Sequence, residues 1–64
     1  MQERLIIEIR RDKYNEWEVS IEKGGWRNTY DPTDYALHPY WGAIDHMIRI
    51  AESTNAASSK MTFS

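Results

Sequence analysis

The feature that most constrains the fold is a strict alternation of polar and apolar side chains over residues 16–22, Glu-Trp-Glu-Val-Ser-Ile-Glu. Side chains of a β-strand point alternately to its two faces, so Trp17, Val19 and Ile21 share one face of a strand. A single strand is not stable by itself in water, because its backbone groups and its apolar side chains need partners. The pattern therefore predicts a sheet with one apolar face.

Residues 4–11 predict the partner strand, because they are rich in β-branched side chains and place Leu5, Ile7 and Ile9 on one face. We expect an antiparallel hairpin across the loop at residues 11–15. A register with Ile9 opposite Trp17 joins the two apolar faces. On the charged face it forms three cross-strand pairs: Arg4 with Glu22, Arg10 with Glu16, and Glu8 with Glu18. The first two attract and the third repels, so charge favours this register.

Gly24 and Gly25 predict a tight turn after the second strand, because glycine readily adopts the positive φ of two-residue hairpins. A short third strand over residues 26–30 follows, with Trp26, Asn28 and Tyr30 on one face. The segment Asp-Pro-Thr-Asp at residues 31–34 is typical of a turn and ends the sheet region.

Residues 39–52 predict an amphipathic α-helix, with Pro39 in the first turn, where its missing N–H costs little. Thr33 or Asp34 is placed to cap a short helical turn before it. Apolar side chains fill about 180° of the helical wheel, which is wider than the ~100° stripe that covers a small core. Either Trp41 or Ile50 therefore lies at an exposed edge, or a second copy of the chain covers this face.

Together the elements predict an α+β fold, a three-stranded antiparallel β-meander over residues 4–11, 16–22 and 26–30 packed by one C-terminal α-helix. Residues 1–55 form one small domain, with Asn55 ending the helix. Residues 56–64 form either a flexible tail or a short edge strand at 60–63. Many unrelated small domains share this strand–strand–strand–helix order, so it implies no function. The hairpin-then-helix outline loosely resembles small antitoxin and double-stranded-RNA-binding folds, but no family motif supports either.

The chain has 64 residues and no cysteine. A chain this short buries only about 60% of its unfolded surface, and disulfides, metals or self-association commonly add the missing stability. Without cysteine, disulfides and thiolate metal sites are excluded, so we expect a homo-oligomer, most simply a dimer. The lack of cysteine and of any long apolar run favours a cytoplasmic protein that does not interact with membranes.

The residues that commonly carry out catalysis do not form a recognisable set. His38 and His46 are eight positions apart, which matches no established zinc pattern, so we interpret His38 as a helix-capping residue and His46 as solvated. Ser20 lies mid-strand between two glutamates, and no Ser–His–acid order with a glycine elbow is present. We expect a non-enzymatic protein with no metal and no cofactor.

Aromatic residues are the strongest functional signal, with three Trp and four Tyr in the chain. Trp and Tyr are favoured at protein interfaces, and one small core cannot bury all of them. We assign Trp17 to the core and predict a protein-binding surface at the sheet-to-helix junction, formed by Trp26, Tyr30, Tyr35, Tyr40 and Trp41. The predicted function is a module that occupies a surface of a larger partner protein, as small inhibitors or adaptors encoded by phages and plasmids do.

Two other functions are open. Arg10, Arg11, Lys13 and Tyr14 surround the first hairpin loop, and a tyrosine among basic side chains can stack on bases, which predicts weak nucleic-acid binding. The net charge of −2 reduces the attraction to phosphate groups. The remaining alternative is a structural subunit of a larger assembly, which would form a closed oligomer of high order.

Overall fold

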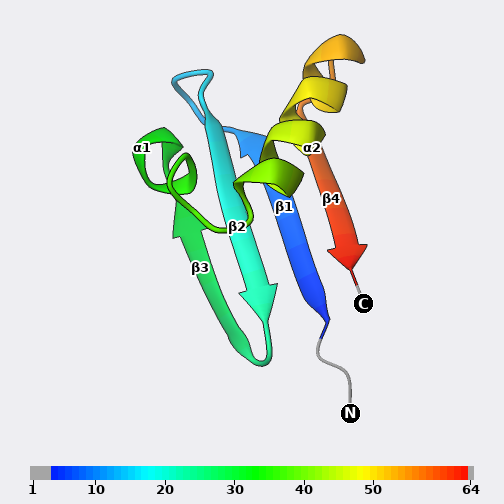
Figure 1. Cartoon of the computed structure of the whole chain (residues 1–64). Coiled ribbons are helices and arrows are strands. Elements are labelled where there is room, and N and C mark those ends of the chain that lie inside the picture. Colours follow the sequence, from blue (N-terminus) through cyan, green and yellow to red (C-terminus); the bar gives the residue numbers. More distant parts are fainter. Residues whose placement is uncertain (1–3, 64) are drawn as a thin grey trace.

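The structure is a computed structural model, drawn in Figure 1, that describes residues 4–63. Six elements follow one another along the chain: β1 (Leu5–Arg11), β2 (Trp17–Lys23), β3 (Trp26–Tyr30), α1 (Pro32–Tyr35), α2 (Trp41–Ser53) and β4 (Ser58–Phe63). Residues 1–3 and 64, which belong to the predicted domain and tail, lie outside the described residues.

The four strands form one antiparallel sheet in the order β3-β2-β1-β4, and α2 lies across one of its faces (Figure 1). The predicted α+β class, with three meandering strands followed by a helix, is confirmed. The segment after the helix adopts the strand alternative and is two residues longer than the predicted 60–63. Because β4 pairs with β1, the first strand lies inside the sheet and β3 and β4 form its two edges.

The predicted register between β1 and β2 is wrong by two residues. Trp17 lies opposite Arg11 rather than Ile9. The observed pairs on the charged face are Ile6 with Glu22, Arg10 with Glu18, and Glu8 with Ser20. A shift of two residues leaves every side chain on its original face, so the predicted apolar face is retained.

Local hydrogen bonds in the first hairpin loop account for this register. The Asp12 N–H donates to the Glu16 carbonyl oxygen at 2.9 Å and closes the loop. The Asp12 carboxylate accepts from the backbone N–H groups of Tyr14 at 2.8 Å and Glu16 at 3.0 Å, and Asn15 completes the turn with a φ of 64°. Asparagine tolerates this left-handed conformation. These loop bonds outweigh the predicted surface charge pairs, each of which contributes roughly 0.2–1 kcal/mol.

The second hairpin matches its prediction. Lys23 lies opposite Trp26, so Gly24 and Gly25 alone connect the strands. Their φ angles of 58° and 87° are both positive, as a two-residue turn of the primed type requires. The third strand has the predicted bounds, Trp26–Tyr30.

The main helix begins two residues later than predicted, because Pro39 stays in the connection between the helices. Proline disfavours helical backbone at the residue before it, so a helix continuous with α1 cannot form. The cap of α1 is Asp31 rather than Thr33 or Asp34, and its carboxylate accepts the Asp34 N–H at 3.0 Å. At the other end of α2, Asn55 has a φ of 56° and turns the chain toward β4, as expected for a terminator.

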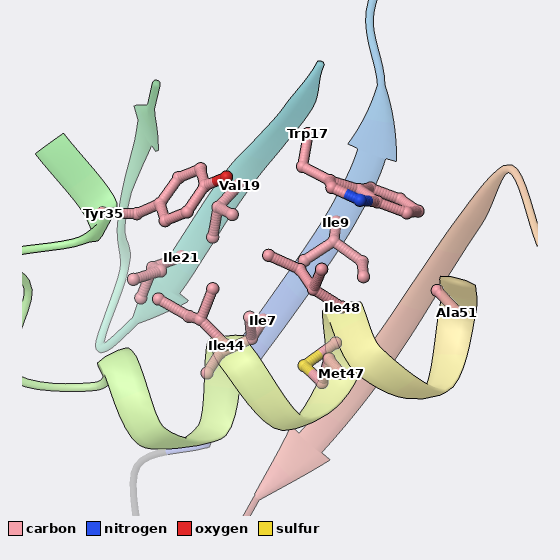
Figure 2. Packing of buried hydrophobic residues seen from close by; sticks show 10 residues of the cluster. All are labelled: Ile7, Ile9, Trp17, Val19, Ile21, Tyr35, Ile44, Met47, Ile48 and Ala51. Carbon is pink, nitrogen blue, oxygen red and sulfur yellow. The ribbon is translucent and has the colours of Figure 1, made fainter. Parts of the chain in front are cut away.

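Ten side chains form one core between the sheet and the helices (Figure 2). They are Ile7 and Ile9 from β1, Trp17, Val19 and Ile21 from β2, Tyr35 from α1, and Ile44, Met47, Ile48 and Ala51 from α2. The predicted apolar faces of the first two strands and the inner half of the predicted helix face therefore meet. Within residues 4–63, neither helix has the length and apolar character needed to cross a bilayer.

Candidate functional site

Three of the five predicted partner-binding residues, Trp26, Tyr30 and Tyr40, are linked through His38 and Lys23. The His38 ring lies between two tyrosines, with its centroid 4.9 Å from that of Tyr30 and 5.1 Å from that of Tyr40. The Lys23 amine donates to the Tyr40 hydroxyl at 3.4 Å, and Lys23 is the cross-strand neighbour of Trp26. The sequence prediction named these three aromatic residues but not His38, which lies between two of them.

The N-cap residue of α2 is Tyr40, so His38 is not the capping residue that the sequence predicted, although it does bond the backbone just before the helix. The His38 Nδ1 accepts the backbone N–H of Tyr40 at 3.0 Å, immediately before α2 begins. One imidazole therefore orders the entry into the helix and packs two aromatic side chains. His46, in contrast, is exposed on α2.

Tyr35 differs from the prediction that it is an exposed contact residue. Its side chain is only 7% exposed and belongs to the core, where Figure 2 shows the ring beside Val19 over β2. The short capped helix α1 turns Tyr35 inward, which the periodicity of the main helix could not show. Burial raises the pKa of the Tyr35 hydroxyl, and the carboxylates of Glu16, Glu52 and Asp31 raise it further.

Trp41 connects the buried and exposed parts of this region. Its ring stacks on Tyr35 with 5.8 Å between centroids and 15° between planes, yet the residue remains 38% exposed. Trp26 is 44% exposed, while Tyr30 and Tyr40 are half-buried against the core. The prediction that Trp26 and Trp41 reach the surface therefore agrees with the structure.

Leu37 is the residue of this region that sequence analysis missed. It lies in the α1–α2 connection and is 85% exposed, more than the other exposed large hydrophobic residues in the described part of the chain. The sequence carried one signal that could have identified it, because Leu37 is an apolar residue outside the periodic apolar patterns of the predicted strands and helix. We use the name aromatic surface for Trp26, Leu37, Tyr40 and Trp41.

The basic residues predicted to contact nucleic acid are divided between the two faces of the sheet. Arg10 lies on the face opposite α2, where it pairs with Glu18 and donates to the Ser20 hydroxyl at 3.1 Å. Arg11 lies on the other face, with its guanidinium 4.3 Å from the centroid of the Trp17 ring. The structure therefore does not bring Arg10 and Arg11 together.

The other two members of the predicted basic cluster lie at the loop tip. The Lys13 amine is 5.2 Å from the centroid of the Tyr14 ring, and Tyr14 is 70% exposed. Nearby, Arg11 donates to the Asn15 carbonyl oxygen at 3.1 Å. A cation–π contact of this kind at an exposed site contributes about 0.5–1 kcal/mol, so it orders the tip only weakly.

The face of the sheet opposite α2 carries paired charges. Glu8 lies 3.6 Å from Arg10 and 3.4 Å from Arg27. Under these side chains Ser20 is only 3% exposed, with its hydroxyl hydrogen-bonded to Arg10 and to Thr29 at 3.3 Å. The serine that the sequence places between two glutamates is therefore held in a polar network.

Within residues 4–63 the structure contains no pocket and no group of three His, Asp or Glu side chains arranged to hold a metal ion. Comparisons with models of protein families, with curated proteins and with solved structures found no match to this chain. A functional assignment therefore rests on the exposed surfaces of the chain itself.

Proposed function

We propose that this chain is a small non-enzymatic protein-binding module whose aromatic surface covers part of a larger partner protein. The observation that carries the proposal is the exposed apolar area around the α1–α2 connection, where Leu37 is 85% and Trp41 is 38% exposed. Single exposed apolar residues are ordinary, but Leu37 and Trp41 are both exposed within five positions of one short connection, and exposed apolar patches mark binding sites. Tryptophan and tyrosine dominate the binding energy of many interfaces.

The packing behind the aromatic surface supports the same proposal. Trp41 is held by its stack on Tyr35, and Tyr40 is held by the Lys23 amine and the His38 ring. Ordering a flexible side chain on binding costs about 0.5–1.5 kcal/mol, so side chains that are already ordered lose less. Trp41 and Tyr40 are thus held in place before a partner binds, and Leu37, in the same connection, is 85% exposed.

The charge distribution favours a protein partner over nucleic acid. Arg10 is already paired with Glu18 and Glu8, and Glu8 also neutralises Arg27. Binding of phosphate groups gains from the release of counterions, which needs several basic side chains that are not engaged with carboxylates. We propose a cytoplasmic location, which the cysteine-free composition supports, and a role as an inhibitor or adaptor of the kind that phages and plasmids encode.

The test is affinity capture from a lysate of the source cells with three immobilised baits: the wild-type chain, Leu37→Asp and Tyr14→Asp. Leu37 and Tyr14 are both highly exposed apolar residues, so each substitution adds the same charge at a site where stability changes by about 0.5 kcal/mol or less. Half of each lysate is treated with nuclease before capture.

We expect one defined protein to be retained by the wild-type and Tyr14→Asp baits and lost with Leu37→Asp, with or without nuclease. Equal retention by all three baits would refute the assignment of the aromatic surface. Retention that disappears after nuclease treatment and with Tyr14→Asp would instead identify the hairpin tip and nucleic acid. Failure of all baits to retain any protein would contradict the proposed function itself.

A further inference from the structure

We propose that the free edge of β4 pairs with β4 of a second copy of the chain, so that two four-stranded sheets join into one. An edge strand presents unpaired N–H and C=O groups, which can form a ladder with another strand. β4 spans six residues, contains no proline and pairs with β1 on one side only. This interface uses other residues than the aromatic surface and holds or fails independently of the proposed function.

The direction of the free backbone groups follows from one hydrogen bond. The Arg11 N–H donates to the Ala57 carbonyl oxygen at 3.1 Å, so the backbone groups of Ala57 point toward β1. In an antiparallel ladder the direction alternates along a strand. The groups that point away from β1, and are free to pair, therefore belong to Ser58, Lys60 and Thr62.

Charge and symmetry select one register for the pairing. A two-fold axis perpendicular to the sheet keeps α2 of both copies on the same face, which requires that opposing residues differ by an even number of positions. Centring the axis at Lys60 would place two ammonium groups directly opposite each other, which is unfavourable. Centring it at Met61 places Lys60 opposite Thr62 of the second copy, and Ser59 opposite Phe63 of the second copy.

The same register covers an apolar side chain that one copy leaves exposed. Met61 lies opposite Ile7, a core residue, so it points to the α2 side of the sheet, and it is 37% exposed. At the two-fold axis Met61 packs against Met61 of the second copy, in a position between the two helices. The pairing thereby covers Met61, which one copy leaves exposed.

The other edge of the sheet, formed by β3, does not offer an equivalent pairing. By the same alternation the free groups of β3 belong to Arg27 and Thr29, and a register centred between them places Asn28 opposite Asn28 of the second copy. Asn28 is exposed and polar, so the apolar contacts of this register are confined to its ends, where Trp26 lies opposite Tyr30 of the second copy. α1 also begins directly after Asp31 and limits the length of β3 that can pair. The edge formed by β4 is therefore the one that fits a second copy.

Matched proline variants test the proposal. Thr62→Pro removes one of the free N–H groups of β4 and leaves the ladder with β1 intact, since proline is tolerated where the N–H faces solvent. Thr29→Pro makes the same change on the edge formed by β3. Sedimentation equilibrium reports mass directly, and circular dichroism confirms that each variant folds. We expect the wild type and Thr29→Pro to sediment at twice the monomer mass of 7.6 kDa, and Thr62→Pro at the monomer mass.

A charge-swap pair tests the register and does not depend on proline. Met61→Lys and Met61→Glu each place like charges at the two-fold axis, so each is expected to be monomeric alone and to form a mixed dimer when the two are combined. A wild type that sediments as a monomer across the micromolar range would overturn the proposal. So would a Thr62→Pro variant that remains dimeric, or charge variants that dimerise separately as well as they do together.

Discussion

Substituting Ile44 and Ile50 separately by alanine tests how α2 is rotated against the sheet. Both residues are isoleucines on one helix, so the loss of a β-branched side chain and the gain in helix propensity are the same in each variant. Ile44 is fully buried, whereas Ile50 is 44% exposed. Any difference between the two variants therefore reports the environment of the side chain.

The expected magnitudes follow from burial. Ile44→Ala removes a buried side chain and leaves a cavity, which costs about 2–5 kcal/mol, and we expect about 3 kcal/mol. Ile50→Ala loses roughly half of the 1.5–3 kcal/mol that full burial contributes and leaves no closed cavity. Alanine recovers about 0.4 kcal/mol through helix propensity at each position, so Ile50→Ala should cost about 0.5–1 kcal/mol.

Urea unfolding followed by far-ultraviolet circular dichroism measures both free energies. It is carried out in the Thr62→Pro background so that self-association does not contribute to stability. A domain of 64 residues is expected to have a free energy of unfolding of about 3–10 kcal/mol. If Ile44→Ala leaves no folded baseline, Ile44→Val, with an expected cost of about 0.5–1.5 kcal/mol, is compared with Ile50→Val, which should cost less because Ile50 is 44% exposed. Equal costs at the two positions would refute the described rotation of the helix.

Three further predictions concern the turns and Tyr35. The pKa of the Tyr35 hydroxyl is higher in the folded than in the unfolded chain, so its contribution to stability is complete below about pH 10 and is lost as the pH rises through the folded value. The stability of Tyr35→Phe should therefore decline less between about pH 9 and pH 11 in urea titrations. A decline equal to that of the wild type would contradict the raised pKa of Tyr35. Asp12→Ala removes the acceptor of two loop N–H groups and should lower the free energy of unfolding by about 1–2 kcal/mol. Asp12→Asn keeps an acceptor and should lower it less. Equal losses in the two variants would show that the side-chain bonds do not stabilise the loop. A Cβ at Gly25 or Gly42 meets no neighbour within 4 Å, but Gly25 has a φ of 87°. Gly25→Ala should therefore destabilise the fold by about 1–2 kcal/mol, while Gly42→Ala in α2 should be neutral or stabilising by up to ~1 kcal/mol. Changes of the same sign at both sites in thermal unfolding would argue against this turn.

Local patterns in the sequence determined most of the elements. Alternation over residues 16–22 defined a strand and its apolar face, and Gly24 with Gly25 defined the second hairpin to the residue. The apolar period of α2 identified its buried face, and Asn55 marked its end. These features depend on neighbours within a few positions, so propensity and periodicity are sufficient to predict them.

Only the tertiary structure decided which residues meet across the chain. A pattern of period two is unchanged by a shift of two residues, so it could not distinguish Ile9 opposite Trp17 from Arg11 opposite Trp17. The position of β4 beside β1 depends on contacts between the two ends of the chain, which no local pattern encodes. The same holds for the functional surfaces, because the fold buries Tyr35, exposes Leu37 and places Arg10 and Arg11 on opposite faces of the sheet. The accessibility of a side chain is set by the elements packed against it and not by its neighbours in sequence.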